Sequence, residues 1–244
     1  MDIYAIYIFI CGLCLGSYYN VVAIRGLRKD SIFTGRSECM TCHTQIKAYD
    51  LIPVFSYFIL RGKCRKCKSS FSPDYILGEL LTGIVFLAMY LRFGLTGELI
   101  IALVFSSVLI LAVLTDIRER LILDIVTLPS MLLLLVLELI INPDHFLQSV
   151  LGGFAIVVGL EMINFFKKDA IGGGDIKLFG VVGIVLGIKL TLMTLFIAAL
   201  VGIVAFLPLY LLKKRDNTLA FAPCIAIAAL FSYCFSDLVL SIIS

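Results

Sequence analysis

Long apolar runs alternate with short polar turns along almost the whole chain. No charged residue occurs between positions 3 and 24. Seven further apolar runs follow, at 75–91, 99–115, 121–141, 146–166, 176–188, 190–212 and 219–243. A helix needs roughly 20 apolar residues to cross the hydrocarbon core of a bilayer. The pattern therefore predicts about eight transmembrane helices, of which 176–188 is the weakest because it is short and rich in glycine.

The first apolar run is expected to stay in the protein as a transmembrane helix. Asp2 stands where a secretory signal has basic residues, and 22 uncharged positions exceed the apolar core of such a signal. The composition agrees, since 61% of the 244 residues are hydrophobic and only 15% are charged. These values exclude an ordinary soluble globule and a disordered chain.

The distribution of lysine and arginine predicts the orientation in the membrane. Eighteen of the twenty basic residues fall on one side if the N-terminus lies outside the cell, and only Arg92 and Lys189 fall on the other. Ten of them lie in the segment 25–74. Since short cytoplasmic loops carry the excess of basic residues, this segment is expected to be cytoplasmic. The net charge of +3 is too small to indicate a nucleic-acid partner.

The segment 25–74 contains two CxxC pairs, Cys39 with Cys42 and Cys64 with Cys67, separated by 21 residues. Two such turns can close a tetrahedral site of four thiolates, which suits zinc, and a metal would stabilise a segment too small to fold readily alone. Two disulfides are disfavoured in a reducing cytosol. A redox pair and an incidental pattern remain as alternatives. The other cysteines, Cys11, Cys14, Cys224 and Cys234, are expected to pack as small apolar groups.

Two aspartates lie at the ends of apolar runs on the same predicted side of the membrane. Asp116 ends the run 99–115, and Asp175 follows Gly172-Gly173-Gly174 at the start of the run 176–188. Ionisable groups at such positions mark functional sites by default. The glycines would let the chain bend sharply, with φ > 0, and admit a substrate backbone. Each aspartate alone would be interpreted as a helix cap or an interfacial charge.

Together the two aspartates support a specific chemistry. Neighbouring carboxyl groups share a proton, so one can act as a base on water while the other donates a proton to a carbonyl, as in aspartic proteases. The sequence has no GxSxG, HExxH or P-loop motif. The only histidines, His43 and His145, lie in the cysteine segment and in a turn on the opposite predicted side. A pair formed by Asp116 and Asp175 is therefore the best-supported catalytic group.

Six motifs follow one another in a fixed order. They are Gly16-Ser17 with Asn20-Val21 and Arg25; Arg36-Ser37-Glu38-Cys39 with Cys42; residues 49–57; Leu60-Arg61-Gly62-Lys63-Cys64 with Cys67; Glu79-Leu80-Leu81-Thr82-Gly83; and Asp116 with Gly172-Gly173-Gly174-Asp175 followed by Lys177-Leu178. This order resembles the type IV prepilin peptidases, which are intramembrane GxGD aspartyl proteases and N-methyltransferases. The resemblance covers nearly the whole chain and places the two catalytic aspartates of the family on Asp116 and Asp175.

The resemblance implies an all-α polytopic membrane helix bundle with a small, zinc-ribbon-like cytoplasmic loop. Residues 1–24 would form the first transmembrane helix, 25–74 the cytoplasmic loop domain, and 75–244 a membrane peptidase core of about seven helices. The enzyme would reside in the bacterial cell membrane and cut the leader from prepilins or pilin-like precursors at the cytoplasmic face. It would then methylate the new N-terminus with S-adenosyl-L-methionine.

Several positions depart from the family or have no assigned role. Gly26-Leu27 replaces a leucine-proline step, and Gly35 stands in place of a proline. Asp124 is expected to have a structural rather than a catalytic role, and Lys177 either stabilises the ionised pair or extends to the interface. Glu79 matches a family position. Glu138, Glu161 and Asp237 are expected to face the interior of the bundle.

Two other classes of protein fit parts of the pattern. A membrane thiol–disulfide carrier would use the two CxxC pairs and would not need Asp116. A proton-coupled transporter would relay protons through acidic residues near the bilayer midplane, whereas Asp116 and Asp175 are expected at one face. No glycine-rich nucleotide-binding loop is visible for a methyl donor, so a peptidase without methyl transfer is a further alternative.

Overall fold

The computed structural model describes residues 2–28, 30–32, 37–168, 170–211 and 220–243, and within them the fold is built from helices with two isolated β-bridges. The chain divides into two compact units, Met1–Leu95 and Thr96–Ser244. This division reflects packing and does not test the predicted domain boundary between residues 74 and 75, which stays a prediction. Gly35, Leu219 and five of the basic residues used for the orientation lie outside the described residues; the five are Lys29, Arg36, Lys213, Lys214 and Arg215.

The first unit contains two long helices, α1 (Ile3–Leu27) and α3 (Asp74–Phe93), which pack closely together. Small residues make this approach possible. A Cβ on Gly12 would lie 2.8 Å from the Cα of Gly83, and a Cβ on Gly16 would lie 2.8 Å from the Cα of Glu79. The loop between the two helices carries a 3₁₀ turn, η1 (Ala48–Leu51), and a short helix, α2 (Phe55–Ile59).

The second unit consists of α4 (Gly97–Glu119), α5 (Asp124–Ile141), α6 (Phe146–Phe166), α7 (Gly173–Leu211), α8 (Ala222–Cys234) and α9 (Ser236–Ile243). Its core is apolar, and the largest completely buried side chains include Phe105 on α4, Leu134 on α5 and Phe179 on α7. Helix α7 contacts α4, α5, α6 and α8, so it forms the centre of this unit.

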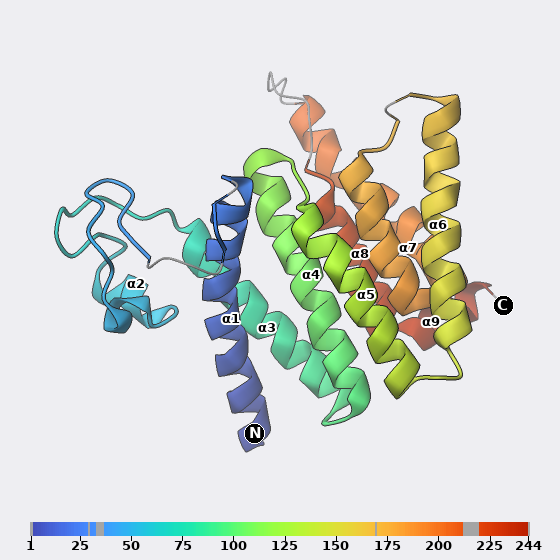
Figure 1. Ribbon diagram of the computed structural model, residues 1–244, viewed down its shortest axis with the longest axis horizontal. Coiled ribbons are helices and arrows are strands. Elements are labelled where there is room, and N and C mark those ends of the chain that lie inside the picture. Colours follow the sequence, from blue (N-terminus) through green and yellow to red (C-terminus); the bar gives the residue numbers. More distant parts are fainter. Residues whose placement is uncertain (1, 29, 33–36, 169, 212–219, 244) are drawn as a thin grey trace. The chain divides into compact units, whose positions relative to one another are not determined.

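Helix α7 is interrupted at Gly187, where the backbone adopts φ 69° and ψ 178°. This conformation is essentially restricted to glycine. Figure 1 shows both ends of α7 at the same end of the second unit, so the chain reverses direction at this residue. The two arms correspond to the predicted runs 176–188 and 190–212. The short first arm is buried through Ile176, Leu178 and Phe179, which is why a brief, glycine-rich run can occupy the core.

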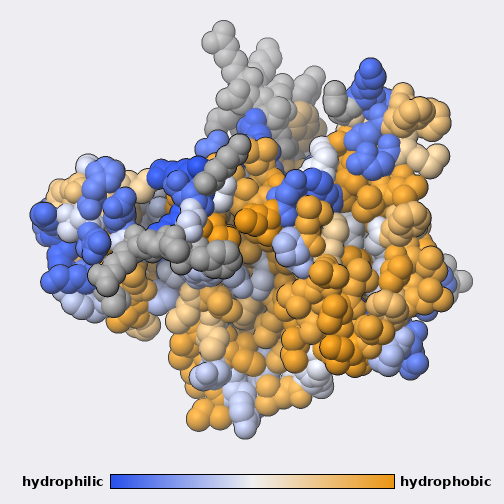
Figure 2. Space-filling view, viewed as in Figure 1, coloured by the Kyte–Doolittle hydropathy of each residue, from blue (hydrophilic) through white to orange (hydrophobic). Residues whose placement is uncertain are grey.

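Six described helices are long and apolar enough to cross a membrane, with α7 counted as one. The structure therefore confirms a multi-pass helical membrane protein, while the number of about eight spans stays a prediction. Apolar side chains are exposed along the long helices, for example Leu132 on α5, Phe154 on α6 and Val204 on α7. Figure 2 shows the resulting apolar surface over the helices. Such a surface is what contact with lipid requires.

The crossing of α6 and α7 provides a test of how closely these helices pack. A Cβ on Gly152 would lie 2.3 Å from the carbonyl oxygen of Gly183, whereas a Cβ on Gly159, on the same helix α6, would meet nothing within 4 Å. We expect Gly152→Ala to lower the free energy of unfolding by about 1–3 kcal/mol, because backbone must move. Gly159→Ala should be neutral or stabilising by up to about 1 kcal/mol. Thermal unfolding in detergent measures both, and equal melting temperatures would contradict the packing.

Candidate active site and cysteine cluster

Asp116 lies near the C-terminal end of α4, and its side chain is buried with only 6% exposure. The backbone N–H of Ala222, at the start of α8, donates a hydrogen bond of 2.8 Å to its Oδ2. Free N–H groups and the dipole at a helix N-terminus favour an anion. The start of α8 therefore binds and orients the Asp116 carboxylate.

Asp175 is the third residue of α7 and is half buried. A Cβ on Gly172 would lie 3.0 Å from Oδ2 of Asp175, and a Cβ on Gly174 would lie 3.0 Å from the side chain of Ile122. None of the three preceding glycines has a positive φ, so the expectation of a sharp turn with positive φ is wrong. Gly172 instead leaves the space beside the Asp175 carboxylate free of a side chain, and Gly174 makes room for Ile122.

Asp116 and Asp175 are brought together at one end of the second unit. The ends of α4 and α6 and both ends of α7 lie there in Figure 1. Among the described residues, a hydrogen bond is found to the Asp116 carboxylate but none to that of Asp175. The structure thus gives the two acids different surroundings, although their catalytic role stays a prediction.

Asp124 and Lys177 form an ion pair beside these acids. Lys177 Nζ, on α7, donates to Oδ1 of Asp124, the first residue of α5, at 2.6 Å. Both side chains are substantially exposed, so the pair adds little stability. The contact agrees with the structural role expected for Asp124. It shows a partner for Lys177 other than the aspartate pair.

The four cysteines of the loop gather into one cluster in the first unit. The Sγ atoms of Cys39, Cys42, Cys64 and Cys67 all lie within 4.8 Å of one another. Cys39 Sγ is 3.7 Å from Cys67 Sγ, and Cys42 Sγ is 4.0 Å from Cys64 Sγ. A tetrahedral zinc site with Zn–S bonds of about 2.3 Å has S–S separations of about 3.8 Å. Disulfides need about 2.05 Å, and all four cysteines are free thiols. The residues therefore fit a metal ion.

The two CxxC turns have the same local geometry. His43 N–H donates to Cys39 C=O, and Lys68 N–H donates to Cys64 C=O. Both His43 and Lys68 have positive φ, 51° and 61°. Each turn is closed by an antiparallel bridge, Glu38 with Gln45 and Lys63 with Ser70. The two matching turns bring their four sulfur atoms together, with every pair within 4.8 Å.

Thiolate forms are favoured at Cys39 and Cys67, whereas the pKa of Cys64 is raised by burial and by those two neighbouring thiols. The pKa of Cys39 is lowered to about 5, first by the Ser69 hydroxyl and then by the backbone N–H groups of Cys42 and Thr41. The Ser69 hydroxyl also lowers the pKa of Cys67. Metals bind thiolates rather than thiols. The Ser69 hydroxyl of the second CxxC turn therefore favours the metal-binding form of Cys39 in the first turn.

An ion pair between a half-exposed arginine and a buried carboxylate connects the cysteine cluster to the segment before α2. Arg65, between Cys64 and Cys67, donates two hydrogen bonds to Asp50, of 3.0 Å from Nε and 2.6 Å from an Nη. The guanidinium lowers the pKa of the Asp50 carboxyl, whose side chain is only 8% exposed. This bidentate contact fixes η1 against the second CxxC turn.

Glu79 joins the same segment to the membrane helices of the first unit. Val54 N–H donates a 2.7 Å hydrogen bond to Glu79 Oε2. The neighbouring Asn20 amide donates to the carbonyl oxygens of Gly16 and Tyr75. Three of the motifs found in the sequence thus meet at one buried polar cluster between α1 and α3.

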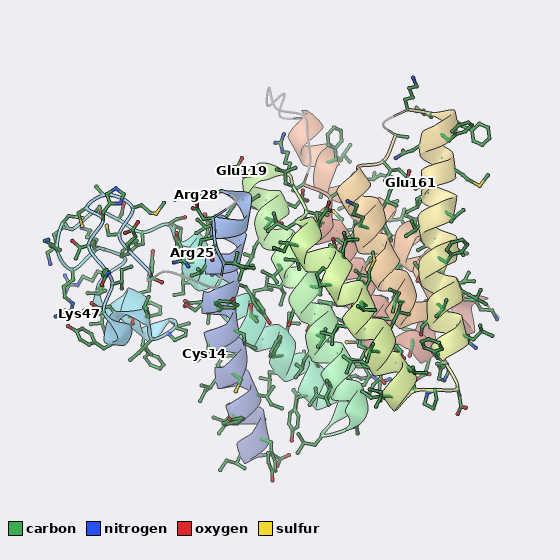
Figure 3. All side chains as sticks on the ribbon, viewed as in Figure 1. Cys14, Arg25, Arg28, Lys47, Glu119 and Glu161 are labelled. Carbon is green, nitrogen blue, oxygen red and sulfur yellow. The ribbon has the colours of Figure 1, made fainter. Side chains whose placement is uncertain are left out.

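The remaining acids and cysteines differ in their surroundings. Glu138 is buried as expected and accepts a hydrogen bond from Asn142, which also donates to Glu98. Glu161 on α6 and Asp237 on α9 are exposed, so the expectation that they face the interior is wrong. Figure 3 shows Glu161 near the end of its helix. Cys224 packs in the core as expected, whereas Cys14 is exposed on α1.

Two groups of functional interest were missed by the sequence patterns. The backbone N–H of Ala222 carries no sequence signature of its own, although Pro223 marks a helix start there. The Arg65–Asp50 pair joins residues 15 positions apart, with no periodic pattern to reveal it.

These features define a polytopic membrane protein. It has two acids at one end of a helical unit and a tetracysteine cluster in its first unit. The comparisons with known proteins identify the class further. Residues 10–93 match the bacterial peptidase A24 N-terminal domain, and residues 103–207 match the type IV leader peptidase family. The chain belongs to the type IV leader peptidase family.

Individual relatives support the same assignment. The chain is 37% identical over 238 residues to a prepilin leader peptidase/N-methyltransferase of Bacillus subtilis, covering 96% of this chain and 95% of the relative. Proteins of the same name from Neisseria gonorrhoeae and Vibrio cholerae are 30% and 32% identical, over 93% and 77% of this chain and 89% and 79% of theirs. No solved structure matches the chain.

Proposed function

We propose that this protein cleaves the leader peptide of type IV prepilins or pilin-like precursors with Asp116 and Asp175. The observation that carries the proposal is that Asp116 ends α4 and Asp175 begins α7, two helix ends that lie at one end of the same unit, in a chain whose relatives are named prepilin leader peptidases. The alternative of a thiol–disulfide carrier is less well supported. The sulfur contacts at 3.7 and 4.0 Å join different CxxC pairs, whereas a redox CxxC forms its disulfide within one pair.

The different surroundings of the two acids suggest a division of labour. Asp116, which accepts an N–H hydrogen bond from the start of α8, is the carboxylate that takes a proton from water. Asp175 carries the shared proton and donates it to the carbonyl oxygen of the scissile peptide as hydroxide adds to its carbon. Collapse of the tetrahedral intermediate returns that proton to Asp175, while Asp116 protonates the leaving amine. The pair is thereby restored to its starting state.

The positions of basic residues support cleavage at the cytoplasmic face of a bacterial cell membrane, with the N-terminus outside. In this orientation the ends of α4 and α7 that carry both acids face the cytosol. The prepilin substrate would approach from the lipid through its own apolar helix, leaving its basic leader on the side where Asp116 and Asp175 lie.

The cysteine cluster is proposed to bind a structural Zn²⁺ through Cys39, Cys42, Cys64 and Cys67. A filled tetrahedron of thiolates leaves no open coordination position for water or substrate. The ion would therefore stabilise the loop and take no part in peptide cleavage.

Methylation of the new N-terminus with S-adenosyl-L-methionine is proposed from the names of the relatives. The described residues include no glycine-rich nucleotide-binding loop between a strand and a helix, so we assign no residue to the methyl donor.

Mass analysis of a co-expressed prepilin tests both activities. We expect the mature pilin to begin immediately after the leader and to carry the additional mass of one methyl group. A precursor that remains full length would contradict the peptidase proposal. A correctly cut but unmethylated pilin would restrict the enzyme to proteolysis.

A further inference from the structure

The short helix α2 presents its apolar face outward. Phe55, Phe58 and Ile59 are 65%, 68% and 73% exposed, and their spacing of three and four residues places them on one side of the helix. The opposite side carries Ser56, which is buried and donates a hydrogen bond to the carbonyl oxygen of Tyr49. Leu51 and Ile52, just before α2, are also exposed. A helix on a water-exposed surface would bury its apolar side chains and expose the polar Ser56.

A hydrogen bond sets the depth of this apolar surface relative to the membrane helices. Val54 N–H binds the carboxylate of Glu79, which lies five residues after the start of α3 at Asp74. Five residues of helix correspond to about 7.5 Å along the axis. Interfacial helices bury their apolar faces roughly 5–10 Å into the boundary between headgroups and acyl chains. With Asp74, the start of α3, taken as the membrane surface, Val54 lies at a depth that matches this boundary, and α2 begins at the next residue.

The backbone that holds α2 in this place is strained. Val54 has φ 64° and ψ −54°, and Phe55 N–H donates a 2.6 Å hydrogen bond to Pro53 C=O across it. This is the rare form of the γ-turn, which persists only where surrounding contacts impose it. The bond to Glu79 and the Arg65–Asp50 pair provide those contacts from either side.

Charged residues beside the apolar surface complement a lipid headgroup layer. Lys47, Arg61 and Lys63 are all exposed and flank the segment 49–60 in the sequence. Figure 2 shows apolar side chains at the edge of the loop where α2 lies and mostly hydrophilic side chains elsewhere on its visible face, and Figure 3 labels Lys47 on the same loop. Basic side chains attract anionic headgroups and can extend to them along their apolar stems.

We propose that Leu51, Ile52, Phe55, Phe58 and Ile59 form a membrane-interface anchor that inserts into the lipid headgroup region beside α3. The loop domain is then attached to the bilayer through α2 as well as through its two ends. The anchor fixes how high the cysteine cluster stands above the membrane. It is independent of whether Asp116 and Asp175 are catalytic.

The absence of tryptophan from the chain provides a clean reporter. Phe58→Trp, in the full protein reconstituted in vesicles of phosphatidylcholine and phosphatidylglycerol with brominated acyl chains, should lose a large part of its fluorescence. Ile84→Trp, an exposed position on α3, gives the response of a lipid-facing side chain, and Met40→Trp, exposed near the cysteine cluster, that of a side chain in water. We expect Phe58→Trp to resemble Ile84→Trp and to be protected from iodide, which quenches Met40→Trp.

A second position guards against local misfolding, since Ile59→Trp should give the same result as Phe58→Trp. Quenching of both by iodide but not by brominated lipid would overturn the proposal. Protection that appears only after addition of a prepilin would also overturn it, because the surface would then bind a protein partner.

Discussion

Asp116→Asn and Asp175→Asn should each reduce cleavage of a prepilin by about 10³-fold or more. Replacing either carboxyl removes the shared proton or the base that accepts one from water. Because the two acids act as a unit, the double variant should be scarcely worse than either single variant. The fraction of mature pilin in membranes, measured at equal enzyme abundance, gives the rate.

Asp124→Asn is a matched control for these variants. Asp124 begins α5 and is paired with Lys177 at 2.6 Å, so it is an acid next to the candidate site with its own partner. Its loss removes an exposed ion pair and should change cleavage by less than about tenfold. Full activity of Asp116→Asn or Asp175→Asn would rule out the paired-acid mechanism, whatever the behaviour of Asp124→Asn.

Cys39→Ser should abolish stoichiometric metal binding and open the loop domain to proteases. Structural zinc contributes apparent binding free energies of about 10–16 kcal/mol in small domains, far more than the short segment 37–73 can supply from its own core. The helices should stay folded, because α1 and α3 pack through their own glycine contacts. Elemental analysis of the purified protein and limited proteolysis of the loop measure the two effects.

Cys14→Ser is the control for the cysteine variant, because Cys14 lies exposed on α1 and outside the cluster. It should leave both metal content and protease resistance unchanged. Cys39→Ser protein with a full complement of zinc would contradict a four-thiolate site. Mobility that changes with reductant in the wild-type protein would instead favour a thiol–disulfide carrier.

Local patterns determined much of the structure. An apolar run long enough to span a bilayer can satisfy its backbone only as a helix, so the runs 3–24, 75–91 and 99–115 correspond to α1, α3 and α4 with ends shifted by a few residues. Spacing likewise indicated the cysteine cluster, since two CxxC turns have few arrangements that bring four thiols together.

No local sequence pattern predicted the contacts between segments that lie far apart in the sequence. Gly172–Gly174 were expected to bend with positive φ, but none of them does, and α7 begins at Gly173 with ordinary backbone angles. The positive φ lies instead at Gly187, between the two predicted runs 176–188 and 190–212. The exposed apolar face of α2 could not be anticipated either. Its direction depends on a hydrogen bond from Val54 to a residue 25 positions away.

The sequence by itself therefore determined which residues can enter a bilayer, which thiols can share a cation and which acids lie at helix ends, since these follow from composition and short spacings. Only the tertiary structure decided what surrounds each of them. The N–H of Ala222 reaches Asp116 across 106 positions, whereas among the described residues no hydrogen bond to the Asp175 carboxylate is found. A backbone donor is the same in every residue type except proline, so only folding reveals which carboxylate it binds.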